Sequence, residues 1–329
     1  MIPITDLSWQ TLSWQELLKN AVSDIKELCE LLDLPPQPHY SDFPLLVPLP
    51  YLSRIDKGNL DDPLLKQILP SAKEDQVILD YVDHPLEEAG YSPIPGLLQK
   101  YQGRALVITS GACAINCRYC FRRHFPYQDF QPNLAQWNKI AEHISADTSI
   151  EELILSGGDP LMMPDRRISD IIASISQINH VKTLRIHTRM PVVLPQRITR
   201  PLLDLLENTR LNVVVVNHIN HAQEIDQDVD VAMSALRKSG VILLNQSVLL
   251  AGINDSADSL INLSKRMFSV GILPYYLHLL DKVKGAAHFD INDQKGLQLI
   301  EEIKEALPGY LVPKLVREVP SMPSKQAIT

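Results

Sequence analysis

The chain has 329 residues, of which 45% are apolar, and is therefore long enough for one large core or a main domain with an appendage. Its formal charge of −8 at pH 7 argues against non-specific binding to nucleic acid, and no stretch approaches the roughly 18–20 uninterrupted apolar residues of a membrane span. The N-terminus lacks a secretory signal and four cysteines are too few for a disulfide framework, so we expect a reduced cytoplasmic protein.

The first 95 residues predict a helical region interrupted by prolines. Ser13 and Glu16 form a capping-box pattern, and apolar residues then recur at helical spacing until two consecutive prolines stop the helix. Cys29 lies on this apolar stripe, where a free thiol packs as a small hydrophobe. The segment "YSPIPG" at 91–96 then marks a boundary.

Beyond this boundary, short apolar runs alternate with amphipathic helical stretches. The apolar runs predict strands at 104–110, 152–158, 183–188, 212–218, 241–250 and 272–280. Helical stretches lie between them, for example at 133–146, 167–178 and 256–270. This alternation predicts parallel βα units. Because six units are fewer than a complete eightfold barrel, we favour a partial barrel over a doubly wound sheet.

Polar residues cluster directly after the predicted strands, at the end where such folds place active sites. Three cysteines, Cys113, Cys117 and Cys120, fall within eight residues after the first strand. A C-x-x-C redox pair would leave Cys113 unexplained, whereas a zinc site would recruit His124 as a fourth ligand. A [4Fe–4S] cluster would bind all three thiolates and leave one iron open to another ligand. The residues alone leave these three hypotheses open.

The spacing C-x3-C-x2-C after the first strand resembles the signature of the radical S-adenosylmethionine (SAM) enzymes. The segments "SGGDPL", "TRMPVVLPQRIT", "NQSVLLAGIND", "PYYLHLLD" and "VPKLVREVPSMPSK" are similar, in this order, to those of the lysine 2,3-aminomutase family. Within that family, the chain looks most like the bacterial members that make (R)-β-lysine for modification of elongation factor P. The resemblance implies a helical N-terminal region (1–95), a radical SAM (β/α)6 core (96–290) and a C-terminal helix and lysine segment (291–329).

The resemblance also implies three cofactors: a [4Fe–4S] cluster on the three cysteines, SAM on the open iron, and pyridoxal phosphate (PLP). Lys325 matches the lysine that carries PLP, with Lys314 as its rival, although "SMPS" replaces the glycine-rich run that often precedes this lysine in the family. Further residues match positions that contact SAM or PLP: Gly157, Gly158 and Asp159 at the methionyl amino group, His218 and Gln246 at SAM or PLP, and Arg104 near PLP. His187 and Arg189 are weaker candidates.

The predicted substrate is L-lysine. Arg122 matches the arginine that binds its carboxylate, which suits a guanidinium fork. Asp281 matches one acid for the ε-ammonium, and Glu318 stands where the second is usually aspartate. Two carboxylates would compensate the desolvation of one buried ammonium. An external one-electron reductant and a lysyl ligase for elongation factor P are the expected partners, without nucleic acid or membrane. The alternatives are an aminomutase that makes a free β-amino acid and a structural zinc protein.

Overall fold

A computed structural model describes residues 7–37, 41–130, 132–320 and 322–329. Its strands form one sheet in which every strand pairs with its neighbour in the sequence. The parallel strands are β2 (Arg104–Ser110), β3 (Glu152–Gly157), β4 (Thr183–Thr188), β5 (Asn212–Asn217), β6 (Ile242–Val248), β7 (Leu273–His278) and β8 (Lys314–Arg317). Two short strands, β1 (Leu97–Leu98) and β9 (Gln326–Ala327), pair antiparallel at the two edges. A strand order without a reversal is that of a barrel, so the predicted partial barrel is confirmed.

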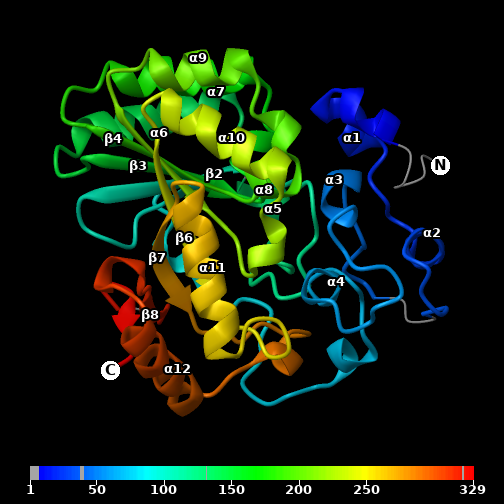
Figure 1. The fold of residues 1–329 in the computed structure, drawn as a ribbon. Helices are drawn as coiled ribbons and strands as arrows, with labels where there is room; N and C mark the ends of the chain where they lie inside the picture. Colours follow the sequence, from blue (N-terminus) through cyan, green and yellow to red (C-terminus); the bar gives the residue numbers. More distant parts are fainter. Residues whose placement is uncertain (1–6, 38–40, 131, 321) are drawn as a thin grey trace.

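Helices follow the parallel strands and cover the outer face of the sheet (Figure 1). They are α6 (Leu134–Ala146), α7 (Asp165–Ser176), α9 (Arg200–Glu207), α10 (Gln227–Lys238), α11 (Ala257–Ser269) and α12 (Asp293–Ala306), with the short helices α5 (Tyr127–Phe130) and α8 (Met190–Val193). Six βα units therefore run from β2 to α12 as predicted, and β8 adds a parallel strand that the sequence analysis did not identify.

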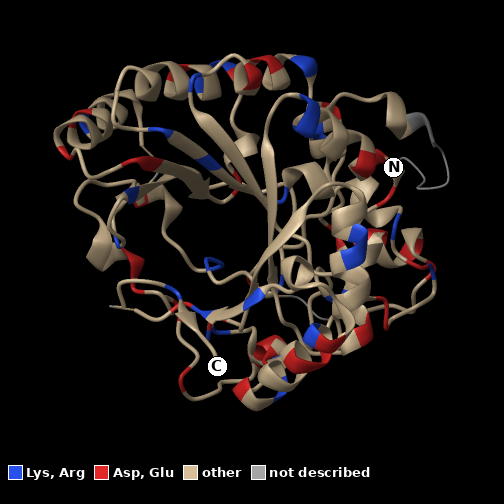
Figure 2. Ribbon diagram, turned by 60° about the vertical axis from the view of Figure 1, so that its left-hand side comes forward, with Lys and Arg blue, Asp and Glu red and all other residues tan. Residues whose placement is uncertain are grey.

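Alternation along the strands gives the barrel a polar interior. In β4, Leu184 and Ile186 are buried, whereas Arg185 and His187, which alternate with them, line the interior cavity. Successive side chains of a strand point to opposite faces, so one face of the strand packs under the helices and the other carries chemistry. On the outside, basic and acidic residues are interspersed along the helices (Figure 2).

The N-terminal region contains α1 (Trp14–Lys19), α2 (Ile25–Leu31), α3 (Leu49–Leu52) and α4 (Pro63–Lys66). The capping box of Ser13 and Glu16 is present, but the single helix predicted after it is wrong. The chain breaks at Val22, which pairs with Val47 through two backbone hydrogen bonds, and the Asp24 side chain caps a new helix. A tertiary strand-like bridge has therefore overridden the helical periodicity.

The N-terminal region and the barrel share one hydrophobic core. Cys29 is 4% exposed within this core, as the packing interpretation predicted. No helix in the described parts of the chain is long and apolar enough to cross a lipid bilayer.

Candidate active site

A cavity of about 300 Å³ occupies the barrel interior. All of the site residues predicted from the sequence line it: Arg104, Cys113, Cys117, Cys120, Arg122, Gly157, Gly158, Asp159, His218, Gln246, Asp281, Glu318 and Lys325. They come from segments that span more than 200 positions of the sequence, and the strand order brings them together. Their placement fits the predicted roles, which themselves stay predictions.

The cysteine loop follows the C-terminal end of β2. Burial, together with the neighbouring thiols, raises the pKa of Cys113 well above its usual value and that of Cys120 to about 11. Thiolates this close together need a bound cation to compensate their charge. His124 lies elsewhere: its Nε2 atom is 3.4 Å from the carbonyl oxygen of Lys284 and 3.8 Å from the Asp83 carboxylate. The three cysteines thus form a set without the fourth ligand that the zinc hypothesis required.

Two glycines let the end of β3 approach the cysteine loop. Gly157 has a φ of +124°, and a Cβ atom there would lie 2.5 Å from the carbonyl oxygen of Ser110. A Cβ atom on Gly158 would collide with the backbone of Ala112. Gly158 N donates to Ser110 O at 2.7 Å. Only glycine fits this close packing of two backbones, which places the loop over the cavity.

Asp159 fastens the ends of β3 and β4 to each other. Its buried carboxylate accepts hydrogen bonds from the Thr188 hydroxyl at 2.7 and 2.9 Å and from the backbone N–H groups of Arg189 at 2.8 Å and Met190 at 3.1 Å. The N–H of Leu161 adds a bond of 2.9 Å. These partners show a structural role for Asp159, and its predicted contact with the amino group of SAM stays a prediction.

Arg122 already binds a carboxylate, that of Glu88 in the short 3-10 turn η3 (Glu88–Tyr91). Its Nε and Nη2 atoms donate to the two Glu88 oxygens at 2.8 and 2.7 Å. Nη1 donates to the Ser156 hydroxyl and to Gly157 O, both at 3.1 Å. The guanidinium is therefore held in the bidentate geometry that carboxylate recognition requires.

Lys325 Nζ donates to Glu318 Oε2 at 2.7 Å inside the cavity. Lys100 Nζ donates to Glu318 Oε1 at 2.6 Å, and the Tyr101 hydroxyl binds the same oxygen. Burial raises the pKa of Glu318, but its cationic partners outweigh this and lower the value to about 2. Lys314, the rival PLP lysine, is exposed at the start of β8 and lines a separate groove.

Asp281 follows β7 and differs from the other acids of the cavity. Its carboxylate makes no hydrogen bond or ion pair with the described residues, and burial raises its pKa to about 7. A desolvated carboxylate without a partner is costly to ionise, so the site lacks a cation that a ligand can supply.

Comparison with known proteins agrees with this geometry. Residues 107–263 match the Radical SAM superfamily. An L-lysine 2,3-aminomutase from Escherichia coli is 46% identical over 319 residues, covering 95% of this chain and 93% of that protein. The Haemophilus influenzae L-lysine 2,3-aminomutase is 47% identical over 95% of this chain and 94% of its own length. The Clostridium subterminale L-lysine 2,3-aminomutase is 33% identical, over 96% and 77% respectively.

The chain belongs to the lysine 2,3-aminomutase family. It is therefore a radical SAM enzyme of the isomerase class, and this membership implies a [4Fe–4S] cluster and SAM. The arrangement of the three cysteines fits the cluster. Among the described residues, no three His, Cys, Asp or Glu side chains gather around a single metal ion. A cubane instead binds its thiolates through separate iron atoms.

Two histidines inside the cavity fit the cofactors of a lysine 2,3-aminomutase: His187, a weaker candidate of the sequence analysis, and His278, which the sequence analysis missed. His278 on β7 lines the cavity, as does His187 on β4, and the Nε2 atom of each is buried without a partner in the described parts of the chain. Burial lowers both pKa values well below the usual range, so the rings are neutral. Buried polar atoms of this kind mark places where a ligand completes the hydrogen bonding. The alternation of β7 could have identified His278, because Tyr276, two positions earlier, also faces the cavity.

The end of the cavity around Lys325 is basic. The Arg104 guanidinium stacks on the Tyr101 ring at 4.6 Å from its centre, and Arg185 faces the same space from β4. Together with Lys100 they give this end cationic groups that suit a phosphate. At the other end, the His218 ring stacks on Tyr119 with ring centres 5.8 Å apart. The donor set therefore fits PLP near Lys325 and SAM near the cysteines.

The N-terminal region supports the cysteine loop from behind, a role that sequence reasoning missed. The fully buried Arg118 donates from Nε to Glu74 Oε1 at 2.8 Å, from Nη2 to the other oxygen of Glu74, and from Nη1 to Phe43 O at 2.7 Å. Arg123 Nη2 binds Glu74 at 2.7 Å. The backbone N–H of Arg118 donates to Gln67 O at 2.9 Å. In this family member, the N-terminal region thus fixes the loop that carries the three clustered cysteines.

Proposed function

We propose that this enzyme converts (S)-α-lysine to (R)-β-lysine, with a [4Fe–4S] cluster on Cys113, Cys117 and Cys120, SAM, and PLP on Lys325. The observation that carries the proposal is one cavity with the cysteine trio at one end, Lys325 at the other and the unpaired Asp281 beside them. The names of the similar proteins support the same reaction.

When bound, these cofactors supply a radical that removes a substrate hydrogen and a conjugated system through which nitrogen moves between adjacent carbons. The chain's own residues position the substrate. Asp281 binds the ε-ammonium, which provides the cation that this desolvated carboxylate lacks. Arg122 binds the α-carboxylate, for which its contact with Glu88 shows the required bidentate geometry.

Glu318 takes part in two successive ways in this proposal. Without PLP, its Oε2 atom accepts from the Lys325 ammonium at 2.7 Å and keeps the lysine directed into the cavity. With PLP on Lys325, that oxygen would lose this partner and would be available as the second acid for the substrate ammonium. Lys100 holds the other oxygen in place in both states.

The biological setting is also part of the proposal. We place the enzyme in the cytoplasm, where an external low-potential donor supplies one electron. A ligase that modifies elongation factor P uses the product. The resemblance to the bacterial members with this role supports the assignment. We also keep the division into an N-terminal region (1–95), a core (96–290) and a C-terminal segment (291–329).

An anaerobic assay tests the reaction. Enzyme reconstituted with iron and sulfide is given SAM, PLP, dithionite and a panel of L-amino acids, and products are resolved by chiral chromatography. We expect turnover of lysine alone, to (R)-β-lysine. Preferred turnover of another amino acid would refute the substrate, and a colourless zinc-loaded protein without turnover would refute the enzyme.

The same preparation tests the PLP lysine. The visible absorbance of protein-bound PLP should disappear in Lys325→Ala and persist in Lys314→Ala, its matched control on the exposed start of β8. Loss of the PLP absorbance in Lys314→Ala but not in Lys325→Ala would make Lys314 the PLP lysine.

A further inference from the structure

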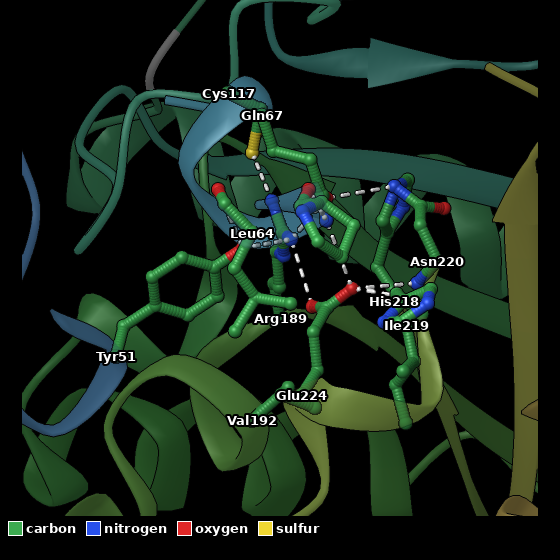
Figure 3. A network of polar contacts seen from close by, with 12 residues as sticks. Tyr51, Leu64, Gln67, Cys117, Arg189, Val192, His218, Ile219, Asn220 and Glu224 are labelled. Atoms are coloured by element: carbon green, nitrogen blue, oxygen red, sulfur yellow. Dashed lines mark hydrogen bonds and ion pairs between the residues drawn. The ribbon is translucent and has the colours of Figure 1, made fainter. Parts of the chain in front are cut away.

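Arg189, which directly follows β4, extends its guanidinium beneath the cysteine loop (Figure 3). Its Nη1 atom donates to the Cys117 sulfur at 2.7 Å. Of the other two cysteines, Cys120 receives a backbone N–H, that of Arg122. A full positive charge therefore lies directly against one sulfur of the trio.

Three buried acceptors hold Arg189 in this position. Its Nη2 atom donates to Gln67 Oε1 at 2.6 Å, to Glu224 Oε2 at 2.8 Å and to the Tyr51 hydroxyl at 3.3 Å. Figure 3 shows Glu224 on the side of the guanidinium opposite Cys117, Tyr51 at one flank, and Gln67 on the same side as Cys117. Because Arg189 is 6% exposed and Glu224 fully buried, water screens this charge pair very little.

Glu224 is itself fixed by the backbone of its own turn. Its Oε1 atom accepts from Asn220 N at 2.8 Å and His221 N at 3.0 Å. Glu224 is therefore fixed where it binds Arg189. The Cys117 sulfur is the partner of the guanidinium that belongs to the proposed cluster ligands.

We propose that Arg189 tunes the reduction potential of the cluster through its charged hydrogen bond to the sulfur of Cys117. The inference rests on the proposed cluster ligands. Reduction adds one electron from an external low-potential one-electron donor and takes the cluster from the 2+ to the 1+ state, without a proton. A guanidinium at a ligand sulfur stabilises the more negative, reduced state, because hydrogen bonds to sulfur and local charge set such potentials. Arg189 therefore raises the potential and brings reduction within reach of the donor.

The test is an EPR-monitored redox titration of the reconstituted holoenzyme with titanium(III) citrate, without SAM. We expect Arg189→Met to lower the midpoint potential at unchanged iron content, and Arg189→Lys, which keeps the charge, to lower it less. Arg197→Met is the matched control. Arg197 is also completely buried, but its guanidinium binds the carbonyl oxygens of Leu161 and Met163 rather than a sulfur.

A second readout is the resonance Raman band of the Fe–S(Cys) stretch. Loss of a hydrogen bond strengthens the iron–sulfur bond, so the band should move to higher frequency in Arg189→Met and stay in place in Arg197→Met. Unchanged potential and Raman bands in an iron-replete Arg189→Met enzyme would overturn the inference, as would an equal shift in the control.

If Arg189→Met fails to retain iron, Glu224→Gln carries the test. Removing the anion beside Arg189 leaves its charge less compensated, so the midpoint potential should rise, and an unchanged or lower value would overturn the inference. Absence of any cluster signal in the wild-type protein would instead refute the proposed function.

Discussion

The two sides of the active-site cavity are built differently. On the side of the N-terminal region, Arg118 and Arg189 are buried and bind several protein groups each. On the side of β7, Asp281 makes no contact of this kind with the described residues, and a ring nitrogen of His278 is buried without a partner. The first side is complete as a protein structure, whereas the second has polar groups that await a ligand.

The difference shows how one fold combines a fixed loop geometry on one side of the cavity with open binding groups on the other. Buried ion pairs with the N-terminal region hold the cysteine loop in a fixed geometry, as a preorganised metal site requires. Charged groups of the substrate bind best to desolvated protein groups that have no other hydrogen-bond partner. Such unpartnered groups make the free protein less stable. Substitutions on the first side should therefore remove the cofactor or the fold, and substitutions on the second should change binding.

The largest effect is expected from Cys113→Ala, which removes one of the three sulfurs. Iron content, the charge-transfer absorbance of the cluster and turnover should all fall to background, because two thiolates do not retain the cluster. Cys29→Ala is the matched control, since this cysteine is buried in the N-terminal core, and it should retain iron. Full iron content in Cys113→Ala would contradict the assignment.

Next in size is Glu74→Ala, which leaves Arg118 and Arg123 buried without their carboxylate. Loss of one partner of a buried ion pair costs about 3–5 kcal/mol, so the free energy of unfolding should fall by that amount. Urea denaturation of the metal-free protein measures it. Glu301→Ala removes the exposed pair with Lys304 and should stay within about 1 kcal/mol of wild type. Equal effects of the two variants would show that the N-terminal region does not clamp the loop.

The smallest effect on the protein is expected from Asp281→Asn. This variant is also the most informative about the β7 side of the cavity. The folded protein keeps the Asp281 proton up to about pH 7, whereas the unfolded chain loses it near the ordinary pKa of 3.8. The folded state therefore binds more protons between these values, and its stability falls as the pH rises through this window. The asparagine variant avoids this loss, so the ligand-free variant should be about 2–4 kcal/mol more stable than wild type at pH 8 and equal to it below pH 4.

In the loaded enzyme the same substitution should weaken lysine binding. The KM of the wild type should fall as the pH rises through about 7, because the ammonium binds the ionised form of Asp281. The variant should have a KM at least about tenfold higher and lose this pH dependence. Unchanged lysine kinetics together with normal cluster and PLP content would remove Asp281 from the substrate site.

The sequence predicted the barrel strands best where polar residues bound a short segment of alternating apolar residues. The strand at 183–188 was placed to the residue, because its apolar pattern is bounded by polar residues at both ends. The four-residue strand Lys314–Arg317 was too short to show periodicity. The break at Val22 depends on Val47, which lies 25 positions away, and local spacing carries no information about such a partner.

The candidate site also has residues that the sequence predicted and residues that it did not. Cys113 and Lys325 were found because motifs mark them, and the barrel topology brings them into one cavity. Glu74 and Arg118 are 44 positions apart, and nothing in either sequence neighbourhood marks a buried ion pair. Charged residues are usually solvated, so their pairing becomes visible only once the chain is folded.

The clamp on the cysteine loop has a consequence for how the chain matures. Ribosomal synthesis proceeds from the N-terminus, so Phe43, Gln67 and Glu74 leave the ribosome before the loop that they hold, at 113–123. The residues that hold the loop have therefore been synthesised before the thiols emerge. A nascent chain that docks the loop at once shortens the time during which three neighbouring thiols stand open to air oxidation before iron is delivered.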